Sequence, residues 1–155
     1  MTKQFKSAFG KIKEYFAETF QQLFGGGKAQ LLLTDNNDVL QAGVEIVVQL
    51  PEKKQQNLAA LSGGERALTV IALLLSFLRY KPSPFTVLDE IDAPLDEPNI
   101  ARFCKYVRKF AEKTQFIIVT HRKRTMEVAD VMYGVTVEDS GVSKVISVRM
   151  EENAD

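Results

Sequence analysis

The chain has 155 residues, the size of one ordinary globular domain, and its hydrophobic and charged fractions of 45% and 26% exclude wholesale disorder. Lysines and arginines number 20, as do aspartates and glutamates, so no overall field attracts nucleic acid or an anionic membrane, and any DNA contact must come from a local patch. The single cysteine, Cys104, excludes an intramolecular disulfide and a multi-cysteine zinc site. With no apolar run of roughly 20 residues, this composition indicates a soluble cytoplasmic protein.

The first predicted element is a helix over residues 3–24. Its apolar residues recur at spacings of three and four and form one narrow stripe, which suits the end of a coiled-coil arm or a helix that lies on a sheet. Three glycines at 25–27 end the helix. Strands at 30–34 and 43–48 then flank a turn of Asp and Asn residues. The stripe consists of Phe5, Phe9, Ile12, Phe16, Phe20 and Leu23.

A polar stretch at 51–57 leads into a helix over 63–80. Ser62 and Glu65 form a capping box at its start, and the prolines at 82 and 84 end it. A second helix, over 97–113, is capped by Asp96 and buries the face made by Ile100, Phe103, Val107 and Phe110.

Short apolar strands at 85–88 and 115–120 lie on either side of this second helix, which makes a βαβ crossover. We expect both strands to be buried in a parallel sheet covered by helices, with ligands at the carboxyl ends of the strands. A short helix follows, and then a hairpin of strands 132–137 and 142–148 joined at 139–141. Residues 151–155 are expected to be a frayed acidic tail.

Two acids, Asp89 and Glu90, directly follow the first of these apolar strands. This is the Walker B arrangement of nucleotide hydrolases, in which the first acid holds Mg²⁺ and the second polarises the attacking water. Both acids reach one site only if the strand ends there, because adjacent strand residues face opposite ways. The alternative is a solvated acidic turn, since Asp92 and Asp96 follow closely.

A second candidate is the sequence Leu61, Ser62, Gly63, Gly64, Glu65 at the start of a helix. Bare backbone N–H groups and the helix dipole favour an anion at such a position. A well-capped helix is the simpler interpretation, but capping does not require two glycines, which cost about 1 kcal/mol each when helical. We favour an anion site.

The only histidine, His121, directly follows the second apolar strand. A lone histidine is more often structural than catalytic, but this position places it at the sheet edge that carries Asp89 and Glu90. The bases at 122–124 add positive charge beside the acids, unless they form a solvated basic turn. One motif is missing: no stretch of this chain fits the phosphate-binding pattern G-x-x-x-x-G-K-[ST], because Gln22 and Ala29 break it around Lys28.

These motifs, in this order, resemble those of ABC-type ATPases, and most closely the C-terminal half of the head of structural maintenance of chromosomes (SMC) proteins from prokaryotes. Residues 61–65 resemble the signature motif, 85–90 Walker B, 92–96 the D-loop, and His121 the switch histidine. The resemblance extends over nearly the whole chain from about Phe20. One departure is Pro94, where the family more often has alanine.

The resemblance implies an α/β fold, namely the C-terminal lobe of an ABC-type P-loop ATPase head. This lobe has a parallel sheet with flanking helices and a C-terminal antiparallel hairpin. Residues 1–24 would be the root of a coiled-coil arm, 25–150 the half-head and 151–155 the tail. The N-terminal half would supply Walker A, and strands of that polypeptide would complete the sheet. Asp89 would hold Mg²⁺, Glu90 would activate water, and His121 would contact the γ-phosphate. The signature residues would contact the ATP of a second head, with Asp92 and Asp96 at the interface between heads.

The partners implied are the N-terminal half, a second copy of the head, a kleisin subunit and DNA, at the nucleoid in the cytoplasm and not at a membrane. A basic helical face that could touch DNA fits a solvated face equally well; its residues are Arg102, Lys105, Lys109 and Lys113. Two alternatives stay open for the function: a head fragment of a related DNA-repair ATPase, and a non-catalytic interaction module.

Overall fold

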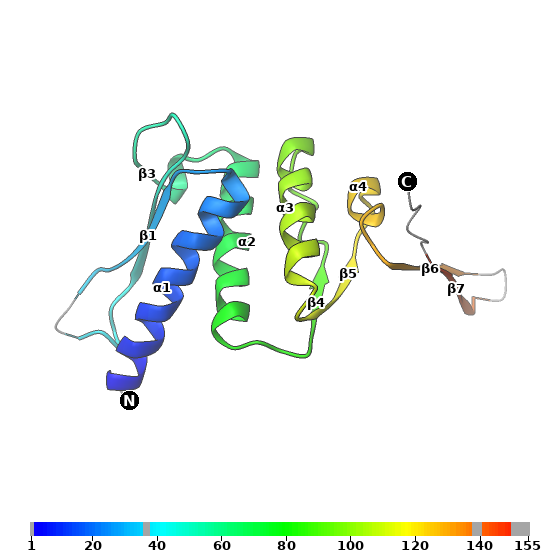
Figure 1. Ribbon diagram of the computed structural model, residues 1–155, viewed down its shortest axis with the longest axis horizontal. Helices are drawn as coiled ribbons and strands as arrows, with labels where there is room; N and C mark the ends of the chain where they lie inside the picture. Colours follow the sequence, from blue (N-terminus) through cyan, green and yellow to red (C-terminus); the bar gives the residue numbers. More distant parts are fainter. Residues whose placement is uncertain (1, 36–37, 138–140, 150–155) are drawn as a thin grey trace.

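The computed structural model describes residues 2–35, 38–137 and 141–149. Figure 1 shows three long helices, α1 to α3, standing side by side, with a small sheet next to α1 and a hairpin at the opposite end of the molecule. The core lies between the helices and the small sheet, and phenylalanine and leucine dominate it. Its completely buried apolar side chains include Phe16, Phe20, Leu23, Leu68, Leu75, Ile100 and Phe103.

Helix α1 (Thr2–Phe24) agrees with the predicted helix and packs against α2 and the first strand. Its buried residues all lie in its second half, from Phe16 to Phe24, while Phe9 and Ile12 in the first half are partly buried against the core. The glycines that follow have positive φ angles. At Gly27 a Cβ atom would lie 2.3 Å from the carbonyl oxygen of Gln49, so no larger residue fits this turn.

The small sheet is antiparallel. Strand β1 (Lys28–Leu33) pairs with β2 (Val44–Gln49), in a register that sets Lys28 opposite Gln49. The stretch predicted as a polar loop contains a two-residue strand, β3 (Gln56–Asn57), and a 3₁₀ helix, η1 (Leu58–Ala60). These two short elements have no periodicity of their own, so neither they nor the pairing of β3 with β2 could be predicted from local sequence.

The predicted βαβ crossover is confirmed. Helix α2 (Gly63–Tyr80) leads to β4 (Phe85–Asp89), α3 (Glu97–Phe110) and β5 (Gln115–Val119). The two strands run parallel, with Asp89 opposite Val119 at their carboxyl ends. Helix α3 ends three residues earlier than predicted, in a turn where the N–H of Lys113 donates to the carbonyl oxygen of Phe110.

The expectation that these strands are buried on both faces is wrong for this chain. On one face Leu88 is buried and Phe116 packs against Phe110 of α3. On the other face Val87 of β4 and Ile117 of β5 lie opposite each other and are 56% and 46% exposed. A continuous apolar run predicts a strand covered on both faces, but the described part of the chain covers only one of them.

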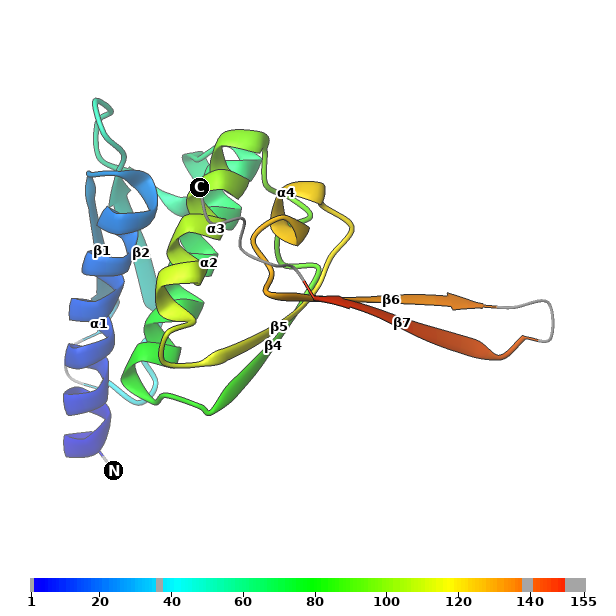
Figure 2. The same cartoon turned by 45° about the vertical axis from the view of Figure 1, so that its right-hand side comes forward.

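After the short helix α4 (Lys123–Met126), strands β6 (Val131–Val137) and β7 (Ser143–Arg149) form the predicted antiparallel hairpin. Figure 2 shows it extending away from the helices, and its apolar side chains, such as Tyr133 and Val135, are exposed. Residues 138–140 and 150–155, which include most of the predicted turn and all of the predicted tail, lie outside the described residues. Among the described residues, none of the helices combines the length and the hydropathy of a membrane span.

Candidate nucleotide-binding site

The acidic loop, residues 89–96, begins where β4 ends. The backbone of Glu90 has a φ of 47°, in the left-handed region, and its N–H donates to the carbonyl oxygen of Val119 at 2.9 Å. This turn stops the strand pairing after Asp89 and leaves the side chains of both acids exposed. The condition for both acids to reach one site, that the strand ends at this point, is therefore met.

The histidine turn, residues 120–125, begins where β5 ends. His121 is exposed, and its Nδ1 atom lies 3.9 Å from Oε1 of Glu90. Parallel strands bring their carboxyl ends to the same edge, and here they bring together an acid and a base that are far apart in the sequence. The predicted proximity of His121 to the acids is thus confirmed.

Asp92 does not lie where it was expected. Its side chain is completely buried, so it cannot take part in a surface contact between two heads. Its Oδ2 atom accepts hydrogen bonds from the hydroxyls of Thr120, at 2.7 Å, and Thr125. Sequence reasoning could not identify these partners, because the acidic loop and the histidine turn belong to different strands.

The bases of the histidine turn also differ from the expectation. Arg122 does not face the sheet edge as a free cation: its Nη2 donates to the carbonyl oxygens of Ala93, at 2.6 Å, and Leu95, at 3.2 Å. Lys123 lies 3.8 Å from a carboxylate oxygen of Glu127, one helical turn further along. Arg122 is therefore engaged within the chain, whereas Lys123, whose side chain is 89% exposed, fits the alternative of a solvated turn.

The signature loop, residues 61–65, has the predicted capping box. The N–H of Glu65 donates to Ser62 Oγ at 3.4 Å, and the N–H of Ser62 donates to Glu65 Oε2 at 3.1 Å. Lys53 donates to the same carboxylate at 2.7 Å, and this hydrogen bond is the main cause that lowers the pKa of Glu65. Leu61 is buried in the core and anchors the loop, whereas Ser62 and Gly63 are exposed at the helix start.

The signature loop and the end of the acidic loop touch each other. A Cβ atom at Gly64 would lie 3.2 Å from Asn99 Nδ2 and 3.4 Å from Asp96 Oδ2, so the start of α2 comes close to the start of α3. Asp96 is exposed and caps α3, with Oδ1 accepting from the N–H of Asn99 at 3.0 Å. The close packing of α2 against α3 is thus one reason for a glycine at position 64, in addition to any role in ligand binding.

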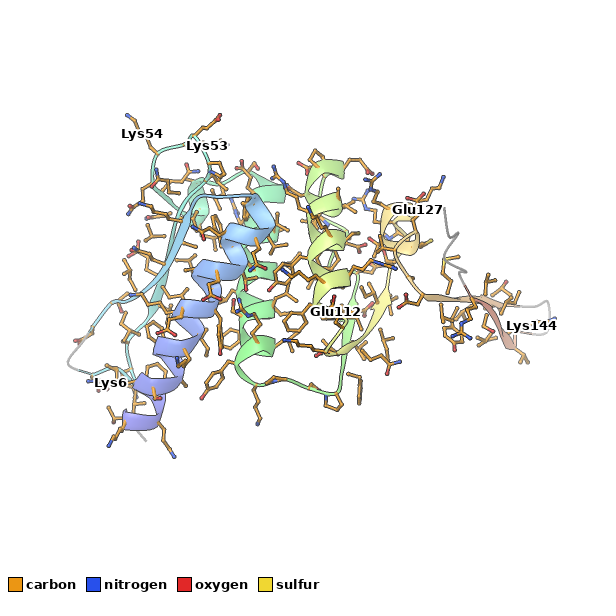
Figure 3. The ribbon with its side chains drawn as sticks, viewed as in Figure 1. Lys6, Lys53, Lys54, Glu112, Glu127 and Lys144 are labelled. Atoms are coloured by element: carbon orange, nitrogen blue, oxygen red, sulfur yellow. The ribbon has the colours of Figure 1, made fainter. Side chains whose placement is uncertain are left out.

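A cavity of about 280 Å³ opens beside this contact. Ser62, Glu65 and Asp96 line it, with the cations Lys53 and Arg102 at its wall. Figure 3 shows that Lys53 and Lys54 lie on the loop that follows β2, which rises next to the start of α2. Apolar side chains, among them Phe24 and Leu50, complete the wall, and the exposed helix start favours an anionic group at its mouth.

Among the described ranges, no three His, Cys, Asp or Glu side chains are placed to hold a metal ion together. Mg²⁺ bound with a nucleotide does not need such a cluster, because one or two carboxylates, phosphate oxygens and water complete its shell. Asp89, an exposed carboxylate at the strand end, fits such a shared site.

The mixed α/β fold matches that of an SMC ATPase head. Residues 2–144 match the family described as RecF/RecN/SMC N terminal domain, and the chain belongs to this family. It is 60% identical over 152 residues to the chromosome partition protein Smc of Bacillus subtilis (strain 168), an alignment that covers 98% of this chain and 13% of that relative.

Two solved structures share the fold. The first comes from work on ATP-driven dimerization and DNA stimulated activation of SMC ATPases; it is 36% identical, has a TM-score of 0.88, and the match covers 96% of this chain and 89% of that one. The second is the Smc head domain from Pyrococcus furiosus with an extended coiled coil, bound to the C-terminal domain of ScpA. It is 39% identical with a TM-score of 0.79, over 91% of this chain and 35% of that one.

Proposed function

We propose that this chain is the C-terminal half of an SMC ATPase head, which hydrolyses ATP only when the N-terminal half supplies Walker A and two heads dimerise. The observation that carries the proposal is the uncovered apolar face of the β4–β5 sheet, where Val87 and Val119 are half exposed. An apolar surface of this kind beside the acids of a candidate site indicates a missing layer of structure. Leu74 and Phe77 of α2 are also exposed.

In the completed head, Asp89 would hold Mg²⁺ and Glu90 would accept the proton of the attacking water. His121, next to Glu90, would contact the γ-phosphate from the same head. Bound ATP would supply the phosphoryl group, and its Mg²⁺ would neutralise the negative charge on the phosphates.

The signature loop would serve the nucleotide of the opposite head. Ser62 and Gly63 are exposed at the start of α2, where N–H groups and the helix dipole favour an anion. Leu61 and Glu65 would hold the loop in shape, one in the core and one in the capping box. Asp96, exposed where the two loops meet, is the acid of the 92–96 segment that can lie between two heads.

A kleisin subunit and DNA are the further partners that we propose, because the Pyrococcus furiosus head is bound to ScpA and the other solved relative concerns DNA stimulated SMC ATPases. Such a complex would work on the chromosome in the cytoplasm. We assign no residues to either contact. The basic face of α3 is exposed, and Arg102 in it donates to Asn99 within the chain.

An ATP titration with and without the N-terminal half tests the proposal. This chain alone should neither bind nor hydrolyse ATP, and the two halves together should do both. Glu90→Gln in the complete head should keep nucleotide-driven dimers and lose turnover by on the order of 100-fold or more. Glu112→Gln, at an exposed glutamate beyond α3, is the matched control and should change neither.

Undiminished hydrolysis by the Glu90→Gln head would refute the role given to Glu90. A complete head that binds nucleotide and never turns it over would instead identify the chain as part of a non-catalytic interaction module. A role in a DNA-repair ATPase would be indicated if the N-terminal half of a repair relative, and not that of an SMC protein, restored activity.

A further inference from the structure

We propose that Asp92 is a positioning residue for hydrolysis: its buried carboxylate joins the acidic loop to the histidine turn and so fixes His121 relative to Glu90. The inference rests on the proposed ATPase function and extends it to a residue that would not itself touch the nucleotide.

The hydrogen bonds of Asp92 bracket the histidine. Its Oδ2 atom accepts from Thr120, directly before His121, and from Thr125, four residues after it. Thr120 in turn accepts the N–H of Arg122 at 3.0 Å through its hydroxyl oxygen. The backbone on both sides of His121 is therefore tied, through two hydroxyls, to one buried carboxylate.

A second set of contacts runs in the opposite direction. Arg122, in the histidine turn, donates from Nη2 to the carbonyl oxygens of Ala93 and Leu95, in the acidic loop. Each loop thus contributes a side chain that holds the other, and the two side chains are Asp92 and Arg122. A displacement of one loop would break contacts on both sides, so the two loops are expected to move as one unit.

The cost of burying Asp92 points to a role other than stability. A buried carboxylate is expensive unless it is fully hydrogen-bonded and paired, and an apolar side chain of similar size often stabilises a fold at least as well. Within the described part of the chain, neither Asp92 Oδ1 nor Arg122 Nε has a hydrogen-bond partner, although both atoms are buried. Incompletely satisfied buried polar groups of this kind occur at functional sites.

The position of His121 matters because its pair with Glu90 lies at the surface, where burial does not restrain the two side chains. Glu90 and His121 are both exposed, and their carboxylate and imidazole atoms lie 3.9 Å apart. Packing does not fix the two side chains, so the backbone positions of the two loops determine how closely they can approach each other. A displacement of about 1 Å in a catalytic group can reduce the rate on the order of 100-fold.

The test uses the complete head with both halves present. Thr125→Val removes one hydroxyl and keeps the side-chain shape, and Asp92→Asn removes the charge and keeps the size. We expect each to lower the kcat of ATP hydrolysis at least 10-fold, while the KM for ATP and nucleotide-driven dimerisation change less than about 2-fold. Thr19→Val, at a buried threonine of α1 that is hydrogen-bonded to Tyr106 of α3 and belongs to neither loop, is the matched control and should leave kcat unchanged.

A double variant separates positioning from a general loss of structure. Once His121→Ala has removed the imidazole, Thr125→Val should have little further effect on kcat, because the group that it positions is gone. The inference is overturned if the losses of kcat from His121→Ala and Thr125→Val are additive in the double variant. It is also overturned if, in Asp92→Asn and Thr125→Val, the KM for ATP rises as much as kcat falls, or if both variants keep wild-type turnover. If the wild-type complete head does not hydrolyse ATP, both the proposed function and this inference fail; if it does and the variants remain active, only this inference fails.

Discussion

Glu90 and His121 face each other across the ends of two parallel strands, with Oε1 and Nδ1 separated by 3.9 Å. Glu90 occupies the first position after β4 and has a left-handed φ of 47°. A residue with a side chain rarely adopts this conformation, and when it does the backbone strain frequently lies at a functional site. The strain therefore supports a chemical role for Glu90. It also leads to a prediction about the stability of variants at this position.

Glycine at position 90 should give a more stable protein than alanine. Both Glu90→Gly and Glu90→Ala remove the exposed carboxylate, but only glycine adopts a φ of 47° without a steric penalty, which is about 1 kcal/mol for other residues. The measurement is urea unfolding of both variants. At Ser7, an exposed position within α1, the same pair of substitutions should give the opposite order, with alanine more stable. Equal stability of the two position-90 variants would argue that the turn relaxes without strain.

The two glycines of the signature loop should respond differently to alanine. None of the atoms that the structure describes lies within 4 Å of a Cβ atom at Gly63, so Gly63→Ala should raise stability by roughly 0.5 kcal/mol. At Gly64 the Cβ atom would press on Asn99 at 3.2 Å, so Gly64→Ala should be the less stable of the two. Thermal unfolding measures this difference.

Gly63→Ala also separates folding from function. If the backbone at the start of α2 holds a phosphate in the completed head, this variant should lose nucleotide-driven dimerisation while its melting temperature stays level or rises. If Gly63→Ala still dimerises with nucleotide, Gly63 does not take part in the proposed contact with phosphate.

Local sequence predicted those parts of the site that depend on neighbours in the chain. The capping box at Ser62 and the short strand predicted over 85–88 follow from residue types within a few positions, and both are present, the strand ending one residue later at Asp89. The role of Asp92 could not be predicted in this way, because its partners follow a different strand. The exposure of Val87 could not be predicted for another reason: its apolar run is typical of a sheet covered on both faces, and the residues that the structure describes cover only one.

The turn between α1 and β1 should tolerate no side chain at Gly27. Alanine there would combine a positive φ of 80° with a Cβ atom 2.3 Å from the Gln49 carbonyl oxygen. We expect Gly27→Ala to lower the free energy of unfolding by about 2–4 kcal/mol. Gly10→Ala, in the middle of α1, is the matched control: a Cβ atom there meets nothing within 4 Å in the described part of the chain, so alanine should raise the free energy of unfolding by about 0.5–1 kcal/mol. If Gly27→Ala lowers the free energy of unfolding only slightly, the backbone of the turn can adopt another conformation.

Cys104 should make stability fall in alkaline solution. Burial raises the pKa of its thiol above the ordinary value of 9.0, so the folded protein holds the thiol proton more tightly than the unfolded chain. This contribution is fully present below about pH 9 and is lost as the pH rises through the folded-state pKa. Urea unfolding between pH 7 and pH 10 should show a decline above pH 9 that is shallower in Cys104→Ala, after subtraction of that variant's lower stability at pH 7. Parallel curves for the two proteins would mean that Cys104 does not contribute, and that the other groups that titrate in this range, lysine and tyrosine, account for the decline.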